Sequence, residues 1–548
     1  MSGSFDGESL AIVVFLAFVA ISLLLCGLAA ADEDDPEHFY AGGAALGPVG
    51  GGLAVAGDYV SAATLLTVTG AVALNGTDGI LFACAGVTSL TLVMVVLARP
   101  LRRSGVYTLG DFLAKRLADS SVRRALGVAT LVVLVPLLVV QLTAAGRIMV
   151  AMFGLPDDLL NACTVGCAAM MICYSALGGM RGTGYIQILK TIIVVGVVMV
   201  VAGLVLSRFG WSPASLFSAA RDGSGHGSSY ALPGLQFGHD LAGRLGLVGF
   251  LLTLVLGAAC MPHITMRLHP MRGPRSGRRA TGWAVGPVAL LCTGVVVIGL
   301  GASALVGGKL LRASDPLGNT ALLMITSALD PQAGGSRHSM LFAVVACAVF
   351  VTTLSTVAGI TLAAASSLAR DFAGQRRDGS PRSIEHEVRF ARWAVAWVGT
   401  VALVLATQAY GRNPQVLLIF SFAAAASVLP PVLLYALFGR GITASGVRWA
   451  VYGTLPVVAF LMTFSPAASG SPIALFPEED FHWFPMHSPG LVTIPVGFLL
   501  ARLGSRRHFG TRRRRGLPPP YADGGAGPVA APYDAVSGPV TRRARRRH

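Results

Sequence analysis

Asp58 is the only carboxylate placed deep in a long apolar run of this chain, and glycines interrupt that run around it (GPVGGGLAVAGDYVSAATLL, residues 47–66). An ionisable side chain at membrane depth costs roughly 2.5 to 3.5 kcal/mol on insertion scales. Such a residue is retained where it faces a cavity, an ion or a partner. Residue type and position therefore predict that Asp58 lies at the centre of a transport site.

The composition indicates a polytopic membrane protein. Of the 548 residues, 54% are hydrophobic and 12% are charged, and the mean hydropathy is +0.67. Soluble domains carry about 25% charged residues. The net charge of +16 does not indicate nucleic-acid binding, because the basic residues alternate between loops and do not gather on one soluble module. The eight cysteines lie in apolar runs and form no C-x-x-C pair, so we expect neither a disulfide framework nor a zinc site.

Thirteen apolar stretches approach the length of roughly 20 residues that crosses a bilayer. Lys and Arg concentrate in alternate loops, which predicts an external N-terminus and a cytoplasmic C-terminus. The acidic loop at 31–38 would be cytoplasmic, but acids have little weight in this rule. The expected location is the inner membrane of a bacterium. The spans are 9–30, 45–72, 78–98, 125–150, 158–177, 185–207, 246–266, 281–306, 338–368, 390–409, 415–438, 447–467 and 488–504.

The predicted transmembrane domain comprises residues 1–504, and a tail follows it. The N-terminal segment lacks the basic start of a cleaved signal peptide, so we expect its first helix to be retained. Residues 505–548 are rich in Arg, Pro and Gly, cannot bury a core, and are expected to form a disordered cytoplasmic tail near anionic lipid.

Two predicted helices carry helix-breaking residues at matching positions. The second helix contains Gly50, Gly51, Gly52 and Gly57, and the seventh contains Gly257 and Pro262. Because they are five spans apart, they cross the membrane in opposite directions and predict two inverted repeats, approximately 45–207 and 246–438. Paired broken helices mark transporter binding sites, since unwound backbone frees carbonyls near the midplane. Glycine alone would equally indicate close helix packing, but glycine together with a buried Asp favours a site.

Motifs along most of the chain resemble those of the sodium:solute symporter family, most of all its cation/acetate and monocarboxylate branch. This resemblance implies an all-α fold of the LeuT type, with a 5+5 inverted repeat, one helix before the ten-helix core and two after it. The motifs are AGDYVSAATLL (56–66), RRSGVYTLGDFLAKRL (102–117), YSALGGMRGTGYIQILKTIIVV (174–195), GAACMPHITMR (257–267), TTLSTVAGITLAAASSLARDF (352–372) and IALFPEEDF (473–481).

The resemblance also implies a sodium site, with Asp58 supporting it from nearby. A small hard cation takes several oxygen ligands, which hydroxyls and freed carbonyls supply without adding a full charge. Without the resemblance, Ser355 and Thr356 would be interpreted as back-bonding to their own helix. The implied ligands are the carbonyls of Ala56, Tyr59 and Thr352 and the hydroxyls of Ser355 and Thr356.

For the substrate, the resemblance implies a small site whose apolar lining suits a short aliphatic acid. Gln141 is a candidate donor to a carboxylate, although a helix-packing hydrogen bond is an equal alternative. Arg147 could attract anions, but we expect it, like Lys190, to reach the membrane interface. His263 and Arg267 are expected to cap the inner end of the seventh helix. The implied substrate-facing residues are Ser61, Thr64, Gln141, Leu254 and Ala258.

The expected function is sodium-coupled import of a small monocarboxylate such as acetate, propionate or pyruvate by alternating access. The alternatives are another small solute such as an amino acid, proton coupling, or a solute sensor that does not transport. An enzyme is not expected, because the spans contain no cluster of His, Asp and Glu, and no phosphate-binding loop indicates an ATP-driven pump. The expected partners are the carboxylate, Na⁺ and the lipid bilayer, with no cofactor, no nucleic acid and a monomeric state. The aromatic segment FPEEDFHWFP (476–485) is expected to act as a lid or interfacial anchor.

Overall fold

The computed structural model describes residues 7–30, 46–104, 107–268, 274–330, 339–373, 384–409, 413–439, 441–471 and 473–514. Within these residues the secondary structure is helical, apart from turns and an isolated bridge between Ser469 and Phe476. The acidic loop predicted at 31–38 and most of the predicted tail lie outside the described residues. The seven cysteines described are free thiols.

The first broken helix forms where the glycines predict it. The helix α3 (Pro48–Tyr59) begins with Pro48 at its first turn and ends at Val60, whose backbone is extended. After the break, the chain continues as η2 (Ala63–Thr67) and α4 (Val68–Asn75), bent by 65° from α3. Gly57 allows α3 to approach α9 closely, because a Cβ there would lie 2.5 Å from the carbonyl oxygen of Gln187.

The second broken helix consists of α11 (Leu241–Ala259) and α12 (Pro262–Met266), separated by Cys260 and Met261. Asp240 caps α11 by accepting a hydrogen bond from the backbone N–H of Gly243, at 3.1 Å. Pro262 ends the first segment and begins the next, since proline has no N–H to donate but suits the first turn of a helix. Both interruptions predicted from the sequence are therefore present.

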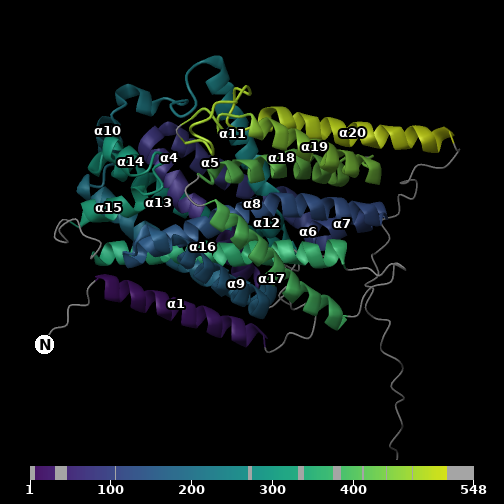
Figure 1. The fold of residues 1–548 in the computed structure, drawn as a ribbon, viewed down its shortest axis with the longest axis horizontal. Coiled ribbons are helices and arrows are strands. Elements are labelled where there is room, and N and C mark those ends of the chain that lie inside the picture. The colour runs from purple at the N-terminus through teal and green to yellow at the C-terminus, as the bar shows by residue number, and fades with distance from the viewer. Residues whose placement is uncertain are drawn as a thin grey trace, which may run out of the picture. The chain divides into compact units, whose positions relative to one another are not determined.

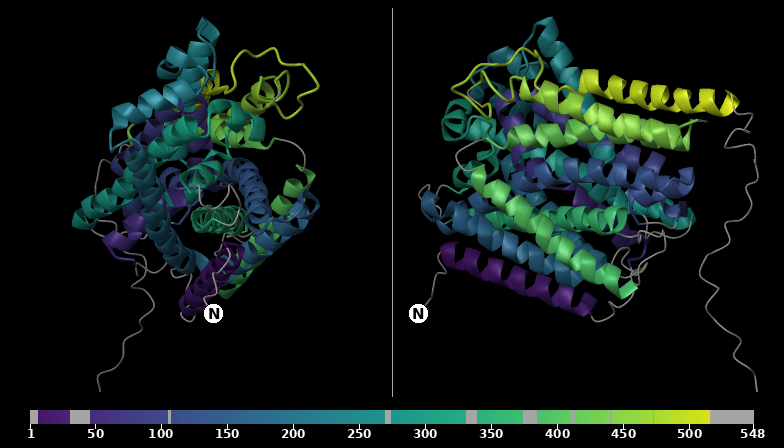
Figure 2. Two further views of the ribbon diagram at one scale, coloured as in Figure 1. Left: turned by 90° about the vertical axis from the view of Figure 1, so that its left-hand side faces the viewer. Right: turned by 45° about the vertical axis from the view of Figure 1, so that its right-hand side comes forward.

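The other helices complete a bundle in which α16 (Met340–Ser367) is the most enclosed (Figure 1). Seen along the bundle, α16 is surrounded by its neighbours, and it packs most extensively against α9 and α8 (Figure 2). The long helices are α1 (Gly7–Ala30), α5 (Thr77–Leu92), α8 (Ser120–Phe153), α9 (Leu160–Arg208), α13 (Pro274–Leu305), α17 (Ile384–Gln408), α18 (Gln415–Leu437), α19 (Ala444–Thr463) and α20 (Gly490–Arg514). The shorter ones are η3 (Val93–Leu97), α6 (Ala98–Ser104), α7 (Leu109–Leu117), η4 (Asp157–Leu159), α10 (Pro213–Gly223), η5 (Gly227–Ala231), α14 (Gly308–Ser314), α15 (Ala321–Leu329) and η7 (Leu368–Phe372).

The predicted count of thirteen spans is not reached by length and hydropathy alone. Among the described residues, nine helices are long and apolar enough to cross a membrane, or ten if the bent pair of α3 with η2 and α4 is one span. One cause is α9, which joins the predicted spans 158–177 and 185–207 through a kink at Gly179 (φ 48°, ψ −153°). That conformation is easily reached by glycine and not by other residues.

At one end of the bundle, a polar network joins α7 to α8 and η7. Asp111 pairs with Arg123 Nε at 3.0 Å and with Arg370 Nε at 2.7 Å. Asp371 accepts hydrogen bonds from Thr108 Oγ1, at 2.8 Å, and from Ser367 Oγ. Apart from Arg123, which lies on α8, these residues come from two of the motifs noted in the sequence, 102–117 and 352–372, so both motifs contribute to one junction.

Candidate functional site

A small cavity lies beside the break after α3. Its volume is about 130 Å³, below the roughly 300–1,000 Å³ of pockets for drug-sized ligands. The walls are mainly apolar and include Phe82, Phe250 and Phe422. All five residues predicted to face the substrate line this one cavity: Ser61, Thr64, Gln141, Leu254 and Ala258. Asp58 and two of the predicted cation residues, Tyr59 and Thr356, line it as well, whereas the other three, Ala56, Thr352 and Ser355, are not among its lining residues.

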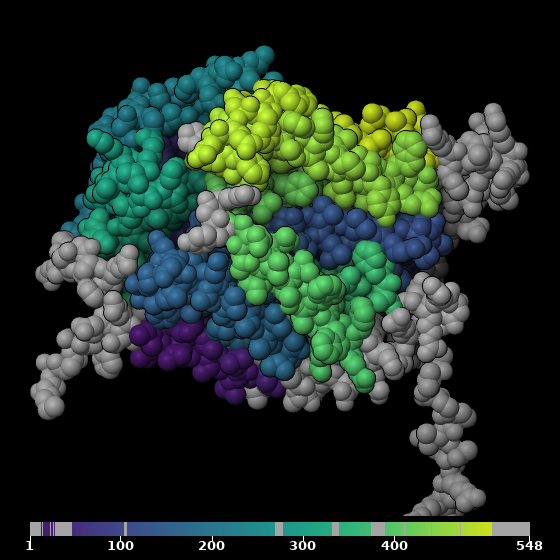
Figure 3. All heavy atoms as spheres, in the orientation of Figure 1, coloured from purple at the N-terminus to yellow at the C-terminus, as the bar shows by residue number. Residues whose placement is uncertain are grey.

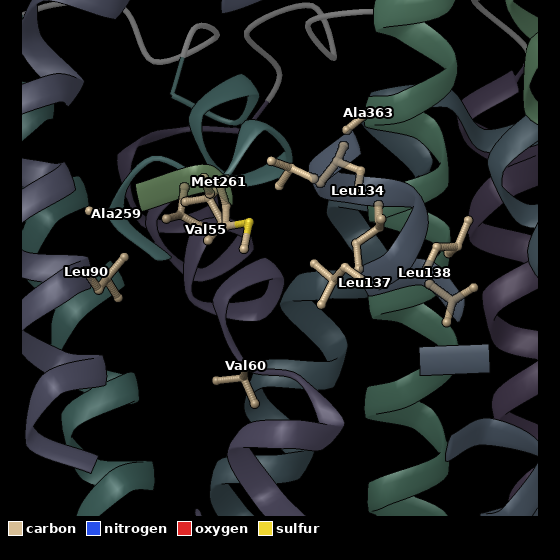
Figure 4. Packing of buried hydrophobic residues seen from close by; sticks show 14 of the residues in the cluster. Val55, Val60, Leu90, Leu134, Leu137, Leu138, Ala259, Met261 and Ala363 are labelled. Carbon is tan, nitrogen blue, oxygen red and sulfur yellow. The ribbon is translucent and has the colours of Figure 1, made fainter. Parts of the chain in front are cut away.

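The break exposes backbone polar groups in the cavity region. The last helical hydrogen bond of α3 runs from the N–H of Val60 to the carbonyl of Ala56, at 3.0 Å. Beyond it, Ser61 and Thr64 cap the next segment, each backbone N–H lying 3.4 Å from the other residue's hydroxyl. The carbonyl of Val60 lies at the break and faces α16, where Thr356 Oγ1 is 3.2 Å away. Figure 4 shows Val60 at this interruption, and shows Val55 and Met261 packed beside each other, away from Val60.

Of the two predicted hydroxyl ligands on α16, Thr356 contacts the break, whereas the hydrogen bonds of the Ser355 hydroxyl are with its own helix. Thr356 Oγ1 donates to the carbonyl of Thr352 at 2.7 Å, and Ser355 Oγ lies 2.7 Å from the carbonyl of Val351 and 3.1 Å from that of Thr352. Each hydroxyl oxygen keeps lone pairs for a cation while its hydrogen is donated to the helix. The structure brings Thr352 and Thr356 next to Val60, a residue that the sequence prediction did not include. Among the described residues, no group of three or more His, Cys, Asp or Glu side chains could hold a metal ion.

Tyr59 and Ala56 contribute differently to this region. The phenol of Tyr59 donates to the carbonyl of Gly86 at 2.6 Å, so its side chain holds α3 against α5. The carbonyl of Ala56 already accepts the last helical hydrogen bond and retains one lone pair.

Asp58 forms a buried ion pair with Arg267, which ends α12. Arg267 Nε donates to Asp58 Oδ2, and the other guanidinium nitrogens donate to the carbonyl of Met180 at 2.6 Å and to Thr183 Oγ1 at 2.8 Å. The side chains of Asp58 and Arg267 are 2% and 4% exposed, so the pair is fully desolvated. Arg267 therefore does more than cap its own helix, as the sequence had suggested, because it links both broken helices to the kink of α9.

The prediction that Lys190 reaches the membrane interface is wrong. Its side chain is fully buried, and Nζ donates to the carbonyl of Val60 at 2.9 Å and to Thr356 Oγ1 at 3.1 Å. A neighbouring residue on α9, Gln187, donates from Nε2 to the carbonyl of Ser355 at 2.9 Å. The physical reason is that the freed carbonyl of Val60 provides an acceptor in the protein interior, so the ammonium group has a partner without reaching water.

Two further cavities lead from the central one. One of about 190 Å³ shares Thr67 and Gln141 with it, and a larger one of about 810 Å³ shares Arg147 and Asn413 with the second. Arg147 thus lines both of the further cavities but not the central one. The outermost walls also include the segment 473–479, whose last four residues belong to the predicted lid, and the acids Asp157 and Asp315. Figure 3 shows this lid segment on the surface of the bundle.

Sequence reasoning missed three contributors to the site: Val60, Arg267 as the partner of Asp58, and Lys190. A signal existed for the two cations, because a buried acid requires a base and Lys190 lies within a predicted span. No sequence signal shows that the carbonyl freed at the break belongs to Val60 as well as to Tyr59, since the point at which the helix ends depends on packing between α3 and α16.

A sequence model of the family described as "Sodium:solute symporter family" matches residues 39–454. A monocarboxylic acid transporter of Corynebacterium glutamicum is 32% identical over 507 residues, covering 90% of this chain and 90% of the relative. An uncharacterized symporter of Bacillus subtilis, YwcA, is 31% identical over 499 residues, covering 90% of this chain and 94% of the relative.

Among solved structures, the chain is similar to the substrate-bound, outward-open state of a Na⁺-coupled sialic acid symporter. The TM-score is 0.68 at 12% identity, over 91% of this chain and 98% of the other. At this identity the likeness concerns the fold alone, and it confirms the LeuT-type architecture that the family resemblance implied.

Proposed function

Because this chain belongs to the sodium:solute symporter family, a family of transporters and not of enzymes, we propose that it imports a small monocarboxylate together with sodium. Acetate, propionate and pyruvate are the proposed substrates. The observation that carries this proposal is the meeting of Ser61, Thr64, Gln141, Leu254 and Ala258 in one small, mostly apolar cavity. The name of the relative from C. glutamicum, a monocarboxylic acid transporter, supports the same substrate class.

The cavity offers both parts that a short carboxylate requires. Phe250, Leu254 and Ala258 supply an apolar wall for the carbon chain. Gln141 has a buried Oε1 with no hydrogen-bond partner, so a rotation of its amide would present N–H donors to the carboxylate. An unpaired buried polar atom costs free energy, which a bound solute or water would recover.

Sodium, the co-transported ion of the family, would bind where the break after α3 faces α16. The proposed ligands are the hydroxyls of Ser355 and Thr356 and the carbonyls of Ala56, Tyr59 and Thr352, with the carbonyl of Val60 added on geometric grounds. Because the ligands come from a broken helix and from α16, the bound ion would hold these two elements together. Sodium binding would therefore stabilise the arrangement of α3 that completes the substrate cavity.

The proposed orientation places the cavity lined by Arg147 outside the cell and the network around Asp111 in the cytoplasm. The distribution of Lys and Arg among the loops supports this orientation. A monomer suffices for the proposal, since all of the proposed site residues come from one chain.

Uptake by proteoliposomes tests the proposal. Purified protein should accumulate labelled acetate or pyruvate when sodium is supplied outside, and should not when potassium replaces it. Labelled proline and glucose are tested in the same way, as solutes of different chemistry. Accumulation of proline or glucose, with no uptake of any short carboxylate, would overturn the substrate assignment while leaving the fold unaffected.

A further inference from the structure

Lys190 differs from the other two lysines of the chain. Lys115 and Lys309 are exposed, whereas Lys190 is fully buried in α9. Its ammonium group ends at the two oxygen atoms that join α3 to α16, the carbonyl of Val60 and the hydroxyl of Thr356. A lysine that is buried at membrane depth and donates to two acceptors indicates a functional position.

The position of this ammonium group coincides with the proposed cation site. Thr356 is a proposed sodium ligand, and the carbonyl of Val60 is the freed carbonyl that faces it at 3.2 Å. An ammonium group and a sodium ion are both compact monovalent cations that take oxygen lone pairs. The two oxygens cannot coordinate a sodium ion closely while Lys190 Nζ remains 2.9 Å and 3.1 Å from them.

The charges around the site also disfavour simultaneous occupation. Among the described residues that line the central cavity, Asp58 is the only acid. Arg267 already pairs with Asp58, and the charges of both residues act on Lys190. A sodium ion beside the ammonium group would therefore be a third positive charge around a single carboxylate, in surroundings that screen charge poorly.

We propose that Lys190 is a tethered competitor of sodium: its ammonium group occupies the cation site when sodium is absent, and sodium binding displaces it from Val60 and Thr356. This inference rests on the proposed function, because it takes sodium to bind at these oxygens. Lys190 would then set the affinity for sodium. It would also hold the break against α16 while no ion is bound.

Direct binding of sodium to purified protein tests the competition without any solute present. The binding of radioactive ²²Na⁺ should be compared at one pH for the parent and for Lys190→Met. This substitution keeps a side chain of similar length and removes its charge. The variant should bind sodium roughly tenfold more tightly, which corresponds to about 1.4 kcal/mol. Lys309→Met removes the same charge from an exposed position and should leave the affinity unchanged.

A gain of affinity is diagnostic, since damage to the fold would lower it. Lys190→Gln provides a second neutral variant in case Lys190→Met does not fold, and size-exclusion profiles identify the folded samples. Equal or weaker binding by folded Lys190→Met and Lys190→Gln, with normal binding by the parent, overturns the inference alone. If neither the parent nor any variant binds sodium, the proposed cation site fails together with the inference.

Discussion

Asp58 and Arg267 form an ion pair that joins the two broken helices. Because the pair is buried, substituting either residue alone should affect the stability of the fold. Removing one partner of a buried pair is strongly destabilising, by roughly 3–5 kcal/mol, because the other charge is left unpaired. The guanidinium of Arg267 also bonds to Met180 and Thr183, so its position depends on three elements. The pair therefore contributes to the placement of α3 next to the cavity, in addition to balancing charge.

The first residue-scale prediction concerns Asp58→Asn. The substitution keeps the shape of the side chain but leaves Arg267 without its counter-charge, so the variant should insert in the membrane and lose accumulation of solute. Membrane content and proteoliposome uptake measure the two effects separately. Asp222→Asn, at a side chain that is 68% exposed, is the matched control and should transport normally. Normal accumulation by Asp58→Asn would move the functional centre elsewhere.

A second residue-scale prediction concerns Ser355→Ala. Hydrogen-bond-like contacts to a charged group contribute about 1.5–3 kcal/mol, so losing this hydroxyl should raise the sodium concentration for half-maximal uptake roughly tenfold or more. Ser366→Ala removes a buried hydroxyl from the same helix, away from the residues that line the cavity, and should leave that concentration unchanged. The proposed role of Ser355 fails if both variants show the sodium dependence of the parent.

At the scale of elements, two kinds of contact hold the bundle around α16. Close approach between helices depends on glycine, as at Gly359, where a Cβ would lie 2.7 Å from Asp58 Oδ1. Polar junctions depend on paired charges, as where Asp111 on α7 bridges Arg123 on α8 and Arg370 in η7. The first kind lets Asp58 pack on α16 near the cavity. The second kind fixes the end of the bundle that is proposed to face the cytoplasm.

Asp111→Asn tests this junction. Asp111 is 5% exposed and its Arg partners are 22% exposed, so the loss is smaller than for a fully buried pair, about 1–3 kcal/mol. The expected result is a lower midpoint of thermal unfolding in detergent. Arg221→Gln, which removes an exposed pair with Asp222, should change the midpoint little, because exposed pairs contribute about 0–1 kcal/mol. Equal midpoints for Asp111→Asn and the parent would show that the junction does not stabilise the fold.

At the scale of the whole transmembrane unit, the volumes of the three cavities decrease from the proposed external end to the centre. Their volumes are about 810, 190 and 130 Å³, and neighbouring cavities share lining residues. A solute entering from the wide cavity would thus pass Arg147 and then Gln141 before it reached the apolar wall. We expect the last and smallest cavity to set the size limit for the solute.

The whole-molecule prediction concerns that size limit. Ala258→Phe adds a ring to the central cavity and should exclude propionate and pyruvate before acetate, because added volume in a packed site causes steric strain. Competition against labelled acetate by a series of acids of increasing length measures the change. Ala169→Phe, at an exposed position on α9, is the matched control. Unchanged inhibition by all of these acids would place the substrate elsewhere.

The architecture could be predicted from the sequence because its causes are local. The glycines of the second predicted helix and Pro262 favour an interruption where they stand, so α3 and α12 begin and end near the predicted residues. The site could be predicted only in part. Lys190 was misplaced because the acceptor that keeps it inside, the carbonyl of Val60, is 130 residues away in sequence and is freed only by the break. Arg267 was assigned to its own helix because nothing local indicates that it reaches α3.

The pairing of Asp58 with Arg267 has a consequence for how this protein can diverge. Either charge alone is harmful once its counterpart is gone, whereas loss of both together leaves no unpaired charge and can be nearly neutral if the space is filled. Single substitutions at either of these two positions should therefore be selected against. Among descendants of this gene, positions 58 and 267 should either both keep their charges or change as a pair, and a suppressor screen starting from Asp58→Asn should recover neutral substitutions of Arg267.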